Sequence, residues 1–163
     1  MQYAVQFLIA LMLLAFSTFI AWYEGSAIRD VPWEWKHTAF FSNVLNGQVT
    51  NNSDISQLDY FIYAAKFHPV YPILILFSLS YIVTLSGYLL LKNYIKRLTV
   101  FLSVISMIYV LLGLTIYSSP IVGGKYLTFV FLFIGLVNLS LAILFFLRVR
   151  KGIKKKGNFI FFT

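Results

Sequence analysis

Four long runs without any Asp, Glu, Lys or Arg constrain what this chain can fold into. The runs cover residues 1–23, 67–91, 98–124 and 126–147, and the shortest of them is 22 residues long. A helix of about 20 apolar residues is long enough to cross the hydrocarbon core of a bilayer. An α-helix also satisfies its own backbone hydrogen bonds, as a bilayer requires. The sequence therefore predicts an all-α, polytopic membrane protein with four transmembrane helices.

The composition supports this class and excludes others. Of the 163 residues, 60% are apolar and only 11% are charged, and the mean hydropathy is +0.84. Average soluble proteins carry about 25% charged residues. The formal net charge of +8 therefore does not indicate a nucleic-acid-binding domain. The absence of cysteine excludes a disulfide scaffold and a zinc–thiolate site.

We expect a single membrane domain in which short connectors join the last three spans. The first run lacks a basic leader and is longer than the 7 to 15 apolar residues of a signal peptide, so we interpret it as a span. The connectors at residues 92–97 and 118–125 are short, which favours antiparallel neighbours. The predicted spans are at about residues 3–22, 71–91, 98–117 and 126–147.

The distribution of basic residues predicts the orientation. Residues 92–97 carry three bases and residues 148–163 carry six, whereas residues 118–125 carry one. Short loops rich in Lys and Arg stay in the cytoplasm. Both termini are therefore expected on the cytoplasmic side of a plasma membrane, with residues 23–67 on the outer side. The basic tail is expected to attract anionic lipid headgroups through Arg148, Arg150, Lys151, Lys154, Lys155 and Lys156.

The outer loop, residues 23–67, is predicted to contain short amphipathic helices. One begins with Pro32 in its first turn, continues through residues 38–45 and ends at Asn46-Gly47. A second is expected to open with a capping box formed by Asp54 and Gln57. Its apolar face would consist of Ile55, Leu58, Ile62 and Ala65. Helices this short cannot form a core of their own, so we expect them to rest on the span ends as a lid.

Candidate contact residues gather in this loop. Trp33 and Trp35 flank Glu34, and two such rings can enclose a cation. Anchoring at the membrane interface explains the same residues without a ligand and is the preferred interpretation. Glu24 lies directly after the first span, where it would act as a relay for protons or cations or pair with Arg29. We expect a partner or ligand to contact Glu24, Trp33, Glu34, Trp35 and Asp59.

Inside the spans the polar residues are small or uncharged, which is typical of helix packing. Ser80 and Thr84 are spaced for close approach of two helices, and Asn138 is expected to form a hydrogen bond between helices. Gly113 and Gly135 belong to the same predicted packing set. The alternative is a lined pore or a docking face for a partner, centred on Asn138.

His37 and His68, together with the acids of the outer loop, are candidate ligands of a metal ion. Histidine and carboxylate ligands suit zinc or iron. No HxH, HxxxH or HExxH spacing is present. We therefore expect no metal, no cofactor and no catalytic residue.

Three strings resemble those of a family of small uncharacterised membrane proteins from spore-forming Gram-positive bacteria. They are WYEGS at residues 22–26, PWEWK at residues 32–36 and QLDYF at residues 57–61. The resemblance covers roughly residues 1–92 and implies a bacterial plasma membrane and a shared outer loop. It implies no activity, because the family has none assigned.

The leading functional hypothesis is a non-enzymatic accessory protein that acts through its outer loop. Its expected partners are the bilayer and a membrane or envelope protein or a second copy of the chain, and not nucleic acid. A small oligomeric transporter or channel is the first alternative, and a metal-dependent membrane enzyme that uses His37 and His68 is the second.

The orientation gives a direct prediction. A reporter that is active only in the cytoplasm, fused after Thr163, is expected to be active, and the same reporter inserted after Asn51 is expected to be inactive. A reporter active only outside the membrane is expected to give the reverse pattern. An extracytoplasmic Thr163 would show that the orientation is wrong.

Overall fold

The structure, a computed structural model, describes the backbone of residues 2–160 and the side chains of residues 2–150. Among these residues every element is helical, and four helices are long and apolar enough to cross a membrane. The predicted fold class is thus confirmed. Each expected span lies within one of these helices to within one residue. The four helices are α1 (Gln2–Gly25), α5 (Val70–Leu91), α6 (Ile95–Ile116) and α7 (Val122–Ile160).

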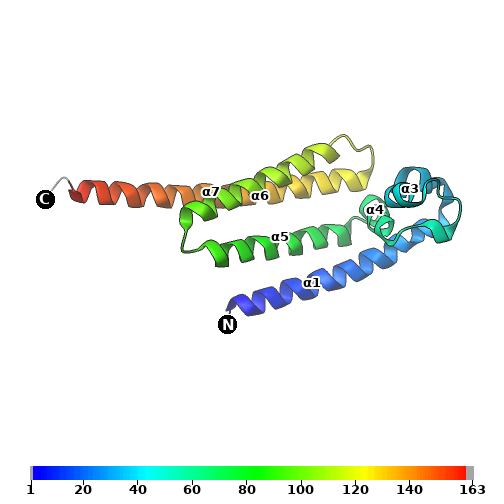
Figure 1. Cartoon of the computed structure of the whole chain (residues 1–163), viewed down its shortest axis with the longest axis horizontal. Coiled ribbons are helices and arrows are strands. Elements are labelled where there is room, and N and C mark those ends of the chain that lie inside the picture. Colours follow the sequence, from blue (N-terminus) through cyan, green and yellow to red (C-terminus); the bar gives the residue numbers. More distant parts are fainter. Residues whose placement is uncertain (1, 161–163) are drawn as a thin grey trace.

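The residues between α1 and α5 fold into a cluster of short helices at one end of the bundle (Figure 1). We call residues 26–67 the cap. The start of α1 and the end of α7 lie at the opposite end of the molecule. The helices of the cap are η1 (Ser26–Asp30), η2 (Pro32–Glu34), α2 (Trp35–Thr38), α3 (Phe40–Asn46), η3 (Asn52–Asp54) and α4 (Gln57–Phe67).

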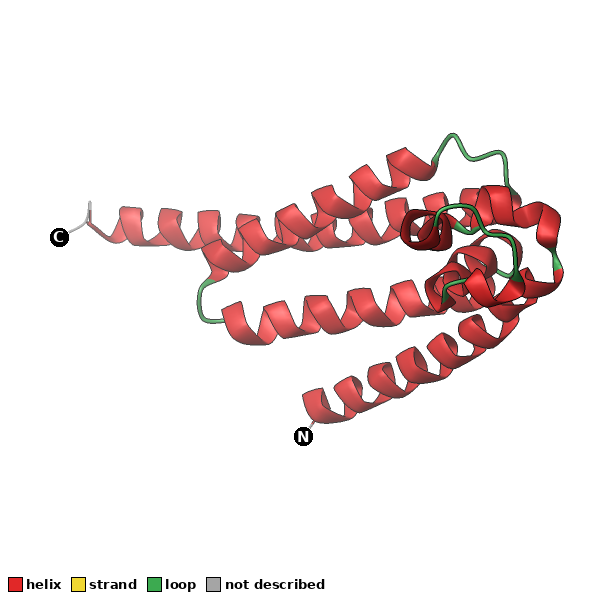
Figure 2. Ribbon diagram, turned by 45° about the vertical axis from the view of Figure 1, so that its right-hand side comes forward, coloured by secondary structure: helices red, strands yellow, loops and turns green. Residues whose placement is uncertain are grey.

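The long helices form two pairs, α1 with α5 and α6 with α7 (Figure 2). The most extensive contact joins α6 to α7, where the Ser106 hydroxyl donates to the Gly135 carbonyl at 2.7 Å. Fewer residues join the two pairs. One link between them is a hydrogen bond of 3.2 Å from the Thr84 hydroxyl on α5 to the Asn138 side-chain oxygen on α7. Polar side chains thus tie the helices together in a medium that offers no water.

Helix α4 lies between α1 and α7, and a glycine permits each contact. A Cβ atom on Gly25, the last residue of α1, would overlap the backbone carbonyl of Tyr60. A Cβ atom on Gly123, in the first turn of α7, would overlap the carbonyls of Ala65 and Lys66. Only a residue without a side chain allows backbones to approach this closely. The cap is therefore fixed to both helix pairs.

The basic segment after residue 147 continues the last helix. Helix α7 has 39 residues and extends to Ile160, so at 1.5 Å per residue it is about 58 Å long, nearly twice the hydrocarbon thickness. The Arg148 guanidinium lies 5.9 Å from the centre of the Phe145 ring. The side chains of Lys151, Lys154, Lys155 and Lys156 lie outside the described residues.

Two details of the predicted cap are wrong. The N-cap of α4 is Ser56, whose hydroxyl accepts from the Leu58 amide at 3.3 Å, and Asp54 instead closes a capping box with Asn51 around η3. The first predicted helix ends at Asn46 as expected, but it is interrupted at Ala39, where ψ is 58°.

The buried face of α4 also differs from the predicted one. Tyr60, Tyr63, Ala64 and Asp59 are buried, whereas Leu58 is 51% exposed. Ile62 and Ala65 are only partly covered. The tyrosines pack with Ile28 and Ala39 into a core within the cap. The expectation that such short helices form no core of their own is therefore wrong, since aromatic rings bury a large apolar area even in a small cluster.

The glycine contacts predict a graded loss of stability. Gly25→Ala and Gly123→Ala are each expected to destabilise the protein by about 1–3 kcal/mol, because the new methyl group must displace backbone. Gly113→Ala is the control, since its Cβ would meet only side-chain atoms, the nearest at 3.2 Å. Thermal unfolding in detergent measures the difference. Equal midpoints for all three variants would contradict the close approach.

Candidate functional site

The cap is organised around the carboxylate of Asp59, which is fully buried. One oxygen accepts from the Phe41 amide at 2.8 Å, and the other accepts from the Ser42 amide at 2.8 Å. The Ser42 hydroxyl donates to that second oxygen as well. It also accepts from the Ser56 amide at 2.7 Å. The Asp59 carboxylate and the Ser42 hydroxyl therefore join the start of α3 to the start of α4.

This arrangement provides hydrogen-bond acceptors for the first amides of α3. The first amides of a helix have no partner inside the helix, and Ala39, the residue before α3, supplies no side-chain oxygen. Asp59 supplies this oxygen from α4, and a negative charge is favourable at the N-terminus of a helix. Hydrogen bonds to an ionised group are among the strongest in proteins. The carboxylate is therefore a structural cap, with both oxygens occupied by the chain itself.

A second cluster places Glu34 and Lys66 on either side of Thr38. The Thr38 hydroxyl donates to the Glu34 carboxylate at 3.0 Å. The Lys66 ammonium donates to the Thr38 hydroxyl at 2.8 Å and to the His37 carbonyl at 2.7 Å. Burial lowers the pKa of Lys66, and the nearby Glu34 carboxylate partly offsets this effect. This cluster ties α2 to the end of α4.

The two tryptophans of PWEWK lie in different surroundings. Trp35 is half-buried, and its indole N–H donates to the Ile28 carbonyl at 2.8 Å. Trp33 is 74% exposed. Trp35 therefore stabilises the cap, while Trp33 is available on its surface.

Glu24 is half-buried at the end of α1. One of its carboxylate oxygens is buried and accepts no hydrogen bond from any described residue. The pairing with Arg29 expected from the sequence is therefore not made through this oxygen. His37 and His68 are exposed, and within the described part of the chain no three His, Asp or Glu side chains gather as metal ligands.

The surface of the cap carries large apolar side chains. Phe40 is 63% exposed, Val44 is 69% exposed and Leu45 is 70% exposed, all on α3. With Trp33 they form the set that we call the exposed cap residues. Single exposed apolar residues are common, but several on one short segment indicate an interaction surface.

The sequence did not identify several residues that hold the cap together. Ser42 and Ser56 are ordinary serines, and only the fold brings them to Asp59. Lys66 is a single base at the end of the outer loop, and only the fold brings it to Thr38 and to the His37 carbonyl. Gly25 lies inside the string WYEGS, so a glycine at the end of a span is the available signal.

Comparisons with known proteins match the part of the chain that contains α1, the cap and α5. Residues 4–91 match the model of a family described as a domain of unknown function, DUF4306. The chain belongs to this family, which confirms the resemblance seen in the three strings. The uncharacterised protein YjdJ of Bacillus subtilis (strain 168) is 39% identical over 80 residues, which are 48% of this chain and 73% of that protein. No solved structure is significantly similar to the chain.

The role of Asp59 is directly testable. Asp59→Ala is expected to destabilise the cap by about 3 kcal/mol, because buried amides lose their only acceptor. Proteolysis of residues 38–66 in intact membranes should then become rapid. Asp54→Ala is the control, because Asp54 lies in the exposed turn and water replaces its hydrogen bonds. Unchanged protection in Asp59→Ala would contradict its role as a cap.

Proposed function

We propose that this protein is a non-enzymatic accessory protein of a bacterial plasma membrane and that it binds a partner protein through its cap. The observation that carries the proposal is the set of exposed cap residues: Phe40, Val44 and Leu45 on α3, whose start is held by Asp59, and Trp33 on η2. A surface that is ordered before binding loses less conformational entropy when a partner docks. The proposal includes the predicted orientation, with both termini in the cytoplasm and the cap outside.

Aromatic residues make this surface suitable for recognition. Trp is the residue most enriched among those that dominate the energy of interfaces, and it acts when a pocket of the partner buries it. Trp33 is the most exposed of the cap residues named here. Glu34, one residue away and half-buried, adds a charge beside it. Asp59 and Trp35 are assigned to holding the surface in place rather than to touching the partner.

The other two hypotheses have less support. An oligomeric transporter needs a polar path, but the clefts beside α5 and α7 are lined mainly by apolar side chains, with Ser80, Thr84 and Asn138 uncharged. An enzyme that uses His37 and His68 needs a third ligand near them, which the described residues do not bring together. The basic end of α7 is proposed to bind anionic lipid on the cytoplasmic side, with Arg148 and Arg150 nearest the span.

Site-specific photo-crosslinking in native membranes tests the proposal. A photoreactive amino acid is placed at Trp33, at Val44 or, as the control, at Leu136, which is 64% exposed on a membrane-spanning helix. Positions 33 and 44 are expected to form an adduct with the same protein, and position 136 is expected to form none with it. Mass spectrometry identifies the adduct. An adduct with a second copy of the chain would identify self-association in place of an accessory role.

A fluorescence measurement separates protein binding from anchoring in lipid. The chain has three tryptophans, so the double variant Trp22→Phe/Trp35→Phe leaves Trp33 as the only indole. With lipids brominated on their acyl chains, we expect little quenching of Trp33 in liposomes. Strong quenching, together with the absence of a protein adduct, would assign the exposed cap residues to the membrane and overturn the proposal.

A further inference from the structure

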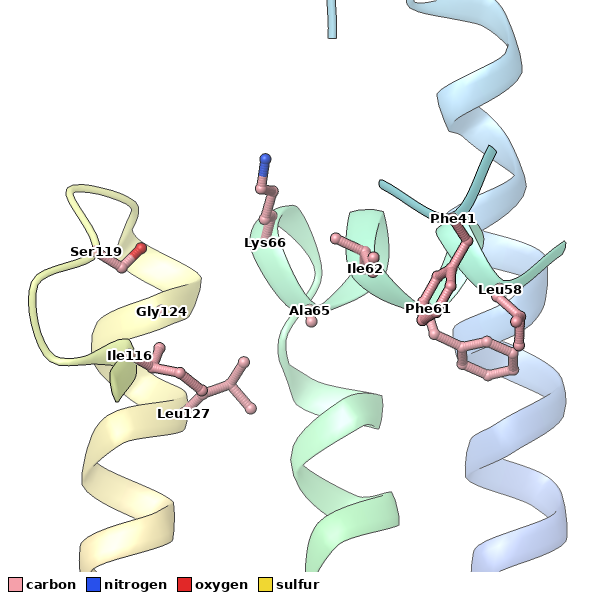
Figure 3. A pocket seen from close by; sticks show the side chains of 10 residues that line it. All are labelled: Phe41, Leu58, Phe61, Ile62, Ala65, Lys66, Ile116, Ser119, Gly124 and Leu127. Carbon is pink, nitrogen blue, oxygen red and sulfur yellow. The ribbon is translucent and has the colours of Figure 1, made fainter. Parts of the chain in front are cut away.

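An open groove runs between the cap and the ends of α6 and α7 (Figure 3). Its volume is about 390 Å³, within the range of ligand pockets in proteins. Helix α4 provides one wall with Leu58, Phe61, Ile62 and Ala65, and Phe41 of α3 extends it. The opposite wall consists of Ile116 and Leu127.

The apolar wall of α4 is the face that the cap leaves uncovered. Leu58, Ile62 and Ala65 are spaced at four and three residues, so they share one side of the helix. The core of the cap instead uses Tyr60, Tyr63 and Ala64. The uncovered face is therefore apolar and lacks a partner within the described part of the chain. In water, such a face would cost about 25 cal/mol for each Å² exposed.

The position of the groove determines which molecules surround it. Ile116 is the last residue of α6, and Leu127 is about 8 Å from the start of α7 at 1.5 Å per residue. These ends mark the boundary at which the hydrocarbon core meets the headgroups. The acyl chains of the bilayer therefore lie beside the apolar part of the groove.

Polar groups line only one end of the groove. The Lys66 side chain points away from Ile116 and Leu127, and Ser119 lies at the same end (Figure 3). Two of the three ammonium hydrogens of Lys66 bind the cap, so one is left to donate. The Ser119 hydroxyl accepts from the Ile121 amide at 3.4 Å, which leaves its own hydrogen free to donate. Glu34 is one hydroxyl away from Lys66, through Thr38.

We infer that the groove binds a phospholipid, with one acyl chain along Ile62 and Ala65 and the phosphate beside Lys66 and Ser119. An apolar channel that ends in two hydrogen-bond donors matches the polarity of a phospholipid at the outer surface of the membrane. A positive ammonium also complements the phosphate charge. The bound lipid fills the space between the cap and α7, so that it joins the two parts. This site uses a different face from the exposed cap residues and does not depend on the proposed partner.

Photolabelling in liposomes tests the inference. The probe is phosphatidylglycerol with a diazirine in one acyl chain, and peptides from the full-length protein are analysed by mass spectrometry. Labelling is expected to concentrate in residues 57–67 and 116–127. Ala65→Trp fills the groove and should lower this labelling at least fivefold. Leu136→Trp, on a lipid-facing part of α7, should leave it unchanged.

A second filling variant and a second probe test the site and the role of the headgroup separately. Ile62→Trp fills the groove from a neighbouring position and serves if Ala65→Trp fails to fold, which size-exclusion chromatography shows. A diacylglycerol with the same diazirine but no phosphate tests the headgroup, and labelling of the groove as strong as with phosphatidylglycerol would overturn the role of the phosphate. Labelling spread evenly over the helices, or unaffected by either filling variant, would overturn the site.

Discussion

The cap depends on one buried carboxylate. Asp59 accepts the free amides at the start of α3 and reaches Ser56 at the start of α4 through Ser42. Without this acceptor, α3 would be a seven-residue helix with unpaired amides, too short to persist alone. Burial of the charge is tolerated because each oxygen is hydrogen-bonded. The exposed cap residues on α3 are therefore presented to the outside by a side chain that is itself inaccessible.

The membrane-spanning part could be predicted from the sequence because one physical requirement dominates it. A charge-free run of about 20 residues can satisfy all its backbone hydrogen bonds in hydrocarbon by forming a helix. The limits of α5 follow from Pro69 and Lys92 at its ends. Helix α6 instead begins at Ile95, three residues before the predicted span, and includes Lys96 and Arg97. Contacts between helices were harder to predict. Gly25 and Gly123 approach carbonyls of α4, and no local pattern indicates which helix a glycine will meet.

The errors in the cap have a common cause. A period of three to four apolar residues marks an amphipathic face, but it does not say which side the protein buries. In α4 both sides are apolar, and the side with Tyr60 and Tyr63 became the core because Ile28 and Ala39 pack against it. Asp59 lies on that buried side, so an acid that resembled a surface contact is internal. Asp54 belongs to η3 rather than to α4, because it forms a capping box with Asn51.

The family match covers one of the two helix pairs and the cap. It ends at residue 91, the last residue of α5, and α6 and α7 follow. The part of YjdJ outside the similarity is about a quarter of that protein, shorter than α7 alone. A protein with only the matched region has the α4 wall of the groove but lacks Ile116 and Leu127. The groove therefore lies where the region that matches the family meets the α6–α7 pair, and a lipid bound there would stabilise this junction. Gly123 brings that pair into direct contact with the cap, at the carbonyls of Ala65 and Lys66. These contacts set both the width of the groove and the position of the cap above it.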